Sequence, residues 1–432
     1  MMRFLSVIAI FLARGIFCFP LAGQVSPAWL EDRIHRDNIH TVILSPADRE
    51  LGYPVMELGS SDRLTLKFDE LTDQPGNYTY TFIHCDAYWQ PSGLSPYEFL
   101  DGFTEDQIQD YRFSFNTTVD YIHYSLTFPN EQIDFRLSGN YILLVYQDYD
   151  QSKPVLTRRF SVYENLVQIS PEIKPPVLTE LNRSGQEIDV QVSLGSYPMR
   201  DPMDELHLVI RQNGRWDNAV MGLKPLFIRG SNLSYDHNNE NVFPGINEFR
   251  YFDIRSFRYQ SEFVRNIDYR APWYYVELAP CRERAGKGYF SDPEINGKFR
   301  IEVQEGHHPH TDADYARVFF SYPAAFPFRN TDLFIMGDLT DWQLSKRSIM
   351  VYNESRHQYE LTLLLKQGYY NYWLATRASG ESSADPSPIE GTYYETENDY
   401  LIYLYHRPSG SRYDRLIGYT LANSQGPGRN FR

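Results

Sequence analysis

Three histidines stand close together at His307, His308 and His310, a grouping that could bind a metal ion. Imidazole nitrogens are common zinc ligands, but this stretch lacks a neighbouring cysteine or carboxylate pair at the spacing of a structural zinc site. The polar stretch from Gly306 to Asp312 lies between two strand-like segments. We therefore predict a solvated linker here and no metal site.

The acidic pair Asp148 and Asp150 is a second candidate for ion binding. A common calcium loop spreads its oxygen ligands over about twelve residues around a glycine, and no such pattern surrounds this pair. We interpret the two carboxylates as the charged end of a β-hairpin.

The sequence strings that mark common hydrolases are absent. There is no Gly-x-Ser-x-Gly nucleophile elbow, no His-Glu-x-x-His zinc motif and no phosphate-binding loop. Paired carboxylates for glycoside hydrolysis stay open, because their separation of about 5 to 9.5 Å depends on the fold. We predict no enzyme, no catalytic residue and no cofactor, with a β-sandwich hydrolase as the third hypothesis.

The elements that would position any site are predicted to be strands. Apolar and polar residues alternate with a period of two, which presents one face to a core. With 34 tyrosines against 6 tryptophans, the composition also favours half-buried sheets. The clearest alternating segments are 64–68, 78–82, 121–128, 141–146, 188–192, 206–210, 274–278, 299–303, 318–320, 360–364 and 400–405. Helical signals are few: Pro27–Asp32 favours a short turn, and Thr104–Gln107 has the form of a capping box.

Chain breakers divide the sequence into domains. The proline-rich segment Ser170–Pro176 is predicted to be extended and stiff, because proline restricts its own φ angle and the residue before it. A second break falls at the polar histidine stretch. We predict an all-β protein of three tandem immunoglobulin-like or early-set β-sandwiches, with a signal peptide at 1–23 and domains at 24–168, 169–306 and 307–432.

The N-terminus has the layout of a secretory signal, in which Arg3 is followed by the apolar run Phe4–Leu12 and by small residues near Ala22. Cys18 has a poor context for lipid attachment. Removal of the signal leaves Cys85 and Cys281, and the sequence does not decide whether they form a disulfide.

The net charge and the mean hydropathy limit the classes of partner that this chain could bind. The net charge of -15 disfavours nucleic acid and anionic lipid surfaces as partners. The mean hydropathy is -0.49, and no later segment has the roughly 20 apolar residues of a membrane-spanning helix. We predict no direct membrane span.

The last part of the chain carries a recognisable order of residues. Gly337–Trp342 is followed by Leu365–Trp373, and Asp385–Ser387 and Asn398 come later. This order resembles the glycogen-binding type of early-set carbohydrate-binding module. The resemblance implies that Trp342 and Trp373 are candidate glycan contacts, because aromatic faces stack on sugar rings. The family usually has a lysine at the position of Trp373, and the alternative is that both tryptophans fill a core or pack on a neighbouring domain.

Several longer strings together resemble a second family, the plug proteins of the bacterial type IX secretion system. The strings are Pro154–Phe160, Gln212–Asn218, Asn247–Asp253, Lys366–Tyr372 and Glu390–Asn398. The resemblance implies a periplasmic protein, held at the outer membrane by a protein partner, that closes the inner mouth of the giant β-barrel translocon when no substrate is in transit. A rigid rod of three sandwiches would suit such a role.

One of these strings has its own physical interpretation. Asn213-Gly214 is a preferred two-residue hairpin turn, which would place Arg215 and Trp216 on the return strand. Tryptophan and arginine are enriched at interface hot spots, so both residues are candidate partner contacts. The alternative is that Arg215 stacks on Trp216 or pairs with Asp217 inside the domain.

The leading hypothesis is thus a non-enzymatic plug component, and the second is a periplasmic or surface glycan-binding protein.

Overall fold

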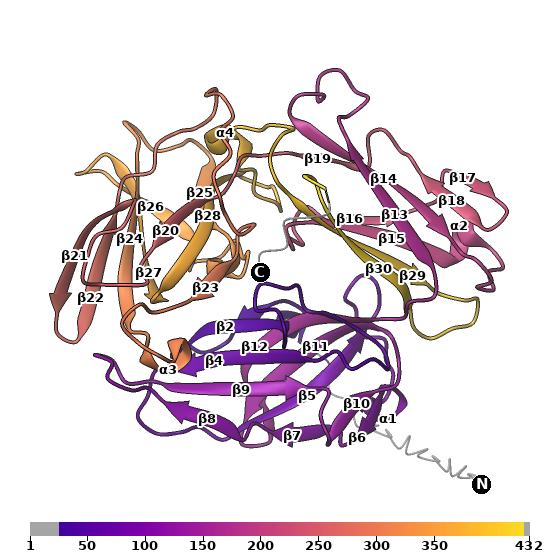
Figure 1. The fold of residues 1–432 in the computed structure, drawn as a ribbon, viewed down its shortest axis with the longest axis horizontal. Coiled ribbons are helices and arrows are strands. Elements are labelled where there is room, and N and C mark those ends of the chain that lie inside the picture. The colour runs from indigo at the N-terminus through magenta and orange to yellow at the C-terminus, as the bar shows by residue number, and fades with distance from the viewer. Residues whose placement is uncertain (1–25, 427–432) are drawn as a thin grey trace, which may run out of the picture.

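A computed structural model describes residues 26–426, so the predicted signal peptide at 1–23 and Cys18 lie outside the described residues (Figure 1). Within these residues the chain is almost wholly β-structure, and every alternating segment of the sequence analysis overlaps a strand. The predicted all-β sandwich class is confirmed. The strands gather into three units, called here the first, middle and third.

The first unit is a sandwich of two sheets. The six-stranded sheet has the order β1-β12-β11-β5-β7, and β3 also pairs with β12. The four-stranded sheet has the order β2-β4-β9-β8. A short pair, β10-β6, lies beside them. The elements of this unit are η1 (Pro27–Trp29), β1 (Arg33–Ile34), β2 (Ile39–Pro46), β3 (Val55–Glu57), β4 (Leu64–Glu70), β5 (Tyr78–Cys85), α1 (Pro96–Phe99), β6 (Leu100–Gly102), β7 (Glu105–Gln107), β8 (Asp110–Phe113), β9 (Ile122–Phe128), β10 (Ile133–Phe135), β11 (Gly139–Gln147) and β12 (Asp150–Tyr163).

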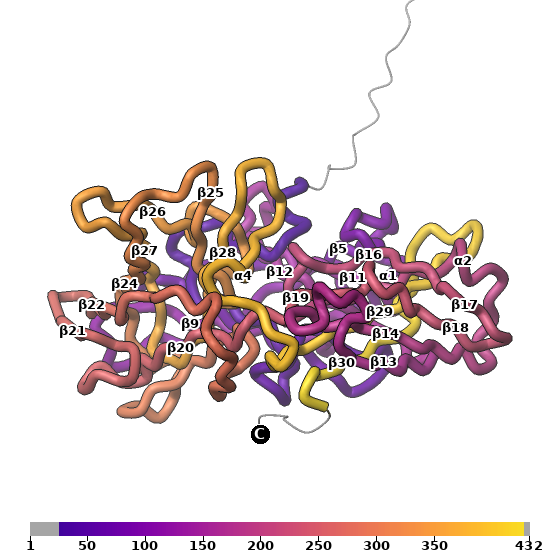
Figure 2. The backbone as a smooth tube through the Cα atoms, turned by 90° about the horizontal axis from the view of Figure 1, so that it is seen from above, coloured from indigo at the N-terminus to yellow at the C-terminus, as the bar shows by residue number. Residues whose placement is uncertain are grey.

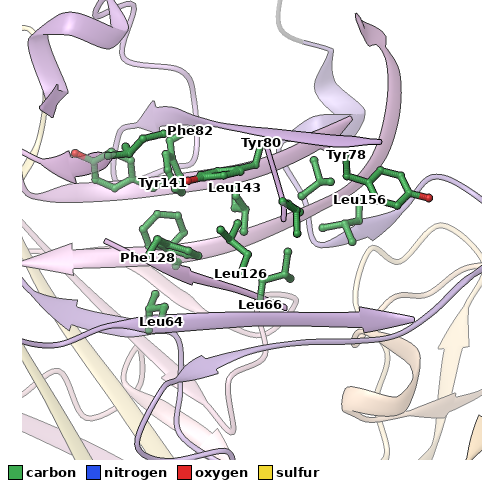
Figure 3. Close-up of a cluster of buried hydrophobic side chains, with 14 of the residues drawn as sticks. Leu64, Leu66, Tyr78, Tyr80, Phe82, Leu126, Phe128, Tyr141, Leu143 and Leu156 are labelled. Carbon is green, nitrogen blue, oxygen red and sulfur yellow. The ribbon is translucent and has the colours of Figure 1, made fainter. Parts of the chain in front are cut away.

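The core of the first unit follows directly from its alternating sequence. Leu64 and Leu66 on β4 face Phe82 on β5 and Tyr141 on β11, and all four side chains are buried (Figure 3). The rings of Phe82 and Phe128 lie 5.1 Å apart between centroids. Burial of each such side chain contributes about 1.5–3 kcal/mol, so this sandwich has a core of its own.

The middle unit is completed by the end of the chain. One sheet has the order β13-β14-β18-β17 with β19 beside β14, and the other has the order β16-β15-β29-β30. The elements are β13 (Gln168–Lys174), β14 (Gly185–Ser193), α2 (Pro202–Glu205), β15 (Leu206–Gln212), β16 (Val220–Leu223), β17 (Phe227–Arg229), β18 (Asn232–Tyr235), β19 (Val242–Pro244), β29 (Asp399–His406) and β30 (Arg415–Asn423). Leu208 pairs with Leu404 across the β15–β29 ladder, and both are buried in one core.

The third unit is inserted into the middle unit. Its nine strands follow the path β20-β28-β25-β26-β27-β24-β22-β21, with β23 beside β28, around one large core and two smaller apolar clusters. The elements are β20 (Arg250–Asp253), β21 (Val264–Arg270), β22 (Trp273–Leu278), β23 (Phe299–Ile301), α3 (Pro309–Asp312), β24 (Tyr315–Pro323), β25 (Thr331–Met336), η2 (Asp338–Thr340), β26 (Ile349–Asn353), β27 (Gln358–Lys366), β28 (Gly368–Ala378) and α4 (Ser387–Glu390).

The pairing of the strands differs from the predicted domain boundaries in two places. The cut expected near residue 306 falls between β23 and β24, which belong to the same strand path, and β29 and β30 pair with the middle unit. The three units also form a triangle in which each touches the other two, not a rod (Figures 1 and 2). Alternation along a chain predicts that a strand exists, but it does not say which strand lies beside it.

Two predictions about local structure had different outcomes. The proline-rich segment is extended, as predicted, but it forms strand β13, where Pro171 is tolerated because β13 is at a sheet edge. The predicted capping box at Thr104–Gln107 is wrong, because Glu105–Gln107 forms β7 and pairs with β5. The capping box is instead at Ser95 and Glu98, where α1 begins.

The first prediction tests whether the middle unit depends on the two strands from the end of the chain. A chain that ends at residue 395 lacks β29 and β30, so Leu208 and its neighbours on β15 would lose the strand that covers them. We expect the middle unit to unfold and to be cut rapidly between residues 165 and 246 in limited proteolysis.

Removal of residues 427–432 alone is the matched control, because it leaves both strands of the hairpin intact. Equal resistance of the two shortened chains to protease would contradict the shared sandwich.

Candidate functional site: the three-way junction

The four residues singled out in the sequence as partner or glycan contacts lie near the centre of the triangle, not on its outer surface. Trp373 is 0% exposed and Arg215 is 2% exposed. Trp216 and Trp342 are partly buried. Whether any of them touches a partner stays a prediction, but their surroundings in this chain are well defined.

Trp373 and Trp342 pack with an aromatic neighbour, Phe249. The rings of Trp373 and Phe249 are stacked with centroids 3.7 Å apart, and Trp342 meets both of them edge-on. The indole N–H of Trp373 donates to the Asn247 carbonyl at 2.9 Å, and that of Trp342 donates to Asp338. Gly297 lies against this group, because a Cβ there would come within 2.6 Å of the Trp342 ring. The faces of the Trp373 ring are therefore covered by protein, and Trp342 is partly buried.

Arg215 connects the middle and third units. Its guanidinium pairs with Asp217 at 2.8 Å and donates to the Ala384 carbonyl of the third unit at 3.2 Å. The pairing with Asp217 is the alternative that the sequence left open. Asn213 and Gly214 have φ angles of 50° and 76°, as the predicted turn requires, but β16 begins only at Val220. Arg215 therefore lies in the loop after the turn, not on a return strand.

Trp216 takes part in a stack that joins the first and middle units. The Arg159 guanidinium of β12 lies 4.5 Å from the Trp89 ring centroid and 5.2 Å from that of Trp216. Arg211 of β15 lies 3.6 Å from the same Trp216 ring. Cation–π contacts of this kind contribute about 0.5–2 kcal/mol each when shielded from water.

The neighbouring Arg158 joins the first and third units. Its guanidinium is 2.7 Å from Asp341, and its side chain is 6% exposed. Asp341 and Trp342 have φ angles of 53° and 56°, a conformation that non-glycine residues adopt only where the surroundings impose it. The loop that presents Asp341 is thus shaped by its contacts in the junction.

A buried ion pair forms a second connection between the first and third units. Lys366 at the end of β27 is 2.6 Å from Asp69 on β4, and the two side chains are 1% and 0% exposed. Asp69 also accepts hydrogen bonds from Tyr315 at 2.7 Å and from His123 at 2.6 Å. Burial acts to raise the pKa of Asp69, but Lys366 and His123 outweigh it and hold the pKa below its usual value. Asp69 is therefore a carboxylate.

Tyr53 marks the point where all three units meet. Its hydroxyl donates to Asp399 of the middle unit at 3.0 Å, and Lys298 of the third unit lies 3.7 Å from its ring centroid. A cavity of about 130 Å³ opens here, lined by charged residues of the three units: Asp32, Arg158, Arg159, Arg211, Lys298 and Asp338. Burial raises the pKa of Asp338 to about 6. The cavity is polar and has room for a few water molecules.

One residue of the histidine stretch, His310, belongs to the junction and is partly buried, whereas His307 and His308 are exposed, as predicted for a solvated linker. His310 stacks on His123 with ring centroids 4.9 Å apart, and its Nε2 lies 2.9 Å from the Lys67 ammonium. Burial lowers the pKa of His310 to about 3, so this imidazole is neutral. Asp312 accepts from the backbone N–H groups of His307 and His308.

The remaining candidates for a chemical site are an acidic cluster and the two cysteines. Among residues 26–426, one group of three potential metal ligands is close enough to share an ion: Glu187, Asp189 and Asp236. Lys174 lies among them and pairs with all three. Cys85 and Cys281 are buried and do not form a disulfide.

Four of the five strings that carry the plug resemblance contribute to this junction. They supply Arg158 and Arg159, Arg215 and Trp216, Asn247 and Phe249, and Lys366 in turn. In the fifth string, Asn398 donates to the Gly245 carbonyl of the middle unit. Asp69, Trp89 and Lys298 were not found from the sequence. No local pattern marks them, because a side chain buried between units, such as Asp69 on β4, has the same sequence signature as a solvent-facing one.

Comparisons with known proteins agree with this architecture. A family model described as "Type 9 secretion system plug protein 1st domain" matches residues 39–164. The crystal structure of a hypothetical protein from Parabacteroides merdae is similar with 35% sequence identity and a TM-score of 0.89, over 91% of this chain and 99% of that chain. A biofilm-associated protein BSP domain has 8% identity and a TM-score of 0.16, which is too low to indicate a similar fold. No curated protein matches the chain.

The fold and junction define an all-β, multi-sandwich protein in which tryptophans and charged residues hold the units together. The chain belongs to the type IX secretion system plug protein family. This is a family of non-catalytic secretion components, and membership implies an association with the cell envelope. Within residues 26–426, no helix is both long enough and apolar enough to cross a membrane.

The buried ion pair gives a second prediction. Replacement of Lys366 by methionine leaves the Asp69 carboxylate buried without its cation, which should lower the free energy of unfolding by about 3–5 kcal/mol. Urea denaturation followed by tryptophan fluorescence measures the change.

Two further variants sharpen this test. Combining Lys366→Met with Asp69→Leu removes both charges and should restore much of the loss, because replacing a whole buried pair by apolar groups is often neutral. The matched control, Lys346→Met, changes an exposed lysine and should move stability by less than about 0.5 kcal/mol. An equal loss in the single and double variants would show that the charge pair is not the cause.

Proposed function

We propose that this protein closes the periplasmic mouth of the giant outer-membrane β-barrel translocon of the type IX secretion system while no substrate is in transit. The observation that carries the proposal is the match of the first unit to the plug family. In this proposal the protein is exported by its N-terminal signal and is periplasmic. It is held at the outer membrane by the barrel and not by a span of its own.

The structure supports a blocking role through its rigidity. A plug must keep its shape against the mouth of a wide channel, so its parts must not slide past one another. Interfaces between domains of one chain are often small and polar, and relative motion is then the default. Here the Asp69–Lys366 and Arg158–Asp341 ion pairs join the first and third units, and a stack of arginines and tryptophans joins the first and middle units. A hydrogen bond from Arg215 to the Ala384 carbonyl joins the middle and third units. Sliding would leave these charges unpaired in a low-dielectric interior.

The glycan-binding alternative gains no support from the junction. The ring faces of Trp373 are covered, and Trp342 is held edge-on against Phe249. A sugar could stack on the Trp373 ring only after the third unit had rearranged.

The third prediction tests the partner. An affinity-tagged copy, expressed in a bacterium that has the secretion system and extracted in a mild detergent, should bring down one very large outer-membrane barrel in near-equal amount. Gel electrophoresis and mass spectrometry of the eluate identify it. A tagged copy of another exported β-sandwich protein is the control, and recovery of our protein without a barrel would count against the proposal.

The fourth prediction tests the blocking role itself. A strain that lacks this protein should become sensitive to antibiotics too large for ordinary porins. Arg158→Ala should give an intermediate sensitivity, because loss of an interfacial charge partner weakens the contact between the first and third units by about 2–5 kcal/mol.

Arg329→Ala serves as the matched control, because Arg329 is exposed and has no ion-pair partner among the described residues. Growth inhibition on graded antibiotic plates is the measurement. A deletion strain as resistant as its parent would rule out the plug role even if the barrel is recovered in the extraction experiment.

A further inference from the structure

A groove of about 960 Å³ lies between the first and third units, outside the central cavity. One wall contains Arg33 of β1 and the bulged segment Thr41–Val42 of β2, and another is the loop Gln343–Arg347. All five consecutive residues of Leu361–Leu365 on β27 line it as well. Side chains alternate between the two faces of a strand, so a cavity lined by every residue in a row is open to the strand's edge.

The strand pairing explains why this edge is free. β26 pairs with β27 only through Val351, Tyr352 and Asn353, opposite Glu360, Tyr359 and Gln358. The preceding residues of β26 turn away and pair with β25, Met350 with Leu333 and Ile349 with Phe334. On its other side β27 is paired with β24 as far as Lys366. Among residues 26–426, no strand pairs with Leu361–Leu365 on the groove side.

An unpaired edge offers a row of backbone N–H and C=O groups that can accept another strand. Five residues span about 17 Å of strand, at about 3.4 Å per residue. Leu361 and Leu363 pack partly against the core of the third unit and leave an apolar surface at this edge. An extended peptide with alternating apolar side chains matches both features.

The charges of the groove favour an acidic peptide. Its carboxylates already have cations or donors in the protein: Asp37 pairs with Arg347, Asp341 pairs with Arg158, and Asp338 accepts from Trp342. Arg33 and Lys346 are exposed and have no carboxylate within ion-pair distance among the described residues. In a chain with a net charge of -15, these two free cations mark a local positive site.

We propose that this groove binds an extended, acidic segment of another protein, which adds to β27 as an extra strand and places its carboxylates at Arg33 and Lys346. The edge lies between the two walls of the groove, an arrangement that suits a single extended chain. This inference does not depend on the plug function.

A direct test uses the mature protein and a fluorescein-labelled ten-residue peptide of alternating valine and glutamate. Fluorescence anisotropy should show saturable binding, and lysine in place of every glutamate should abolish it. A peptide N-methylated at alternate residues on the pairing side should also fail to bind, because it lacks the N–H groups that strand addition uses. Hydrogen exchange should slow at Leu361–Leu365.

The groove is tested by charge reversal. The double variant Arg33→Glu with Lys346→Glu should bind the glutamate peptide about tenfold more weakly or worse. The matched control is Arg282→Glu with Arg329→Glu, which makes the same change of charge at exposed sites outside the groove and should bind normally.

Several outcomes would overturn the proposal. They are no binding of the glutamate peptide, equal binding of the lysine or N-methylated peptides, and slowed exchange confined to residues outside 361–365. Self-association of the protein that is seen by light scattering and lost in the Arg33 and Lys346 double variant would instead assign the groove to a second copy.

Discussion

Buried charges that find their partners on a different unit hold this molecule in one arrangement. Asp69 and Lys366 are 0% and 1% exposed, and each would stay buried without its partner if the first and third units shifted against one another. The cost of an unpaired buried charge is several kcal/mol, a large share of the 5–15 kcal/mol that stabilises a typical domain. The apolar cores fold the three sandwiches, and the charged contacts fix how the sandwiches sit relative to one another.

The path of the chain reinforces this constraint. The third unit leaves the middle unit at Gly245 and returns near Tyr393, and these two crossings touch. A Cβ on Gly245 would come within 1.9 Å of the Tyr393 carbonyl oxygen, so only glycine allows the approach. Ile246 and Tyr393 also share a backbone hydrogen bond. Because both crossings are held together, the inserted unit cannot swing on a single flexible linker.

The sequence predicted the strands of this fold well and their neighbours poorly, for a physical reason. Alternation in segments such as Leu64–Phe68 reflects a local requirement, that one face be apolar, and each of these segments is a strand. The pairing of β15 with β29 joins residues almost 200 positions apart in the sequence and leaves no local sign. The same is true of the junction: Arg158 in a strand resembles a solvent-facing arginine until its partner Asp341 is placed beside it.

For the same reason, the contacts that Arg215, Trp216 and Trp342 make within this chain could not be predicted from the sequence. A tryptophan beside an arginine indicates a tight interface, and Trp216 does lie in one, but that interface is internal, against Arg159 and Trp89. Surfaces that meet a partner must then be sought on the outside of the triangle. The loop Asp338–Trp342 borders both the central cavity and the groove beside β27, because Asp338 and Asp341 line both of them. A strand bound in that groove would contact the same loop that joins the first and third units through Arg158, so binding there and the rigidity of the junction are physically linked.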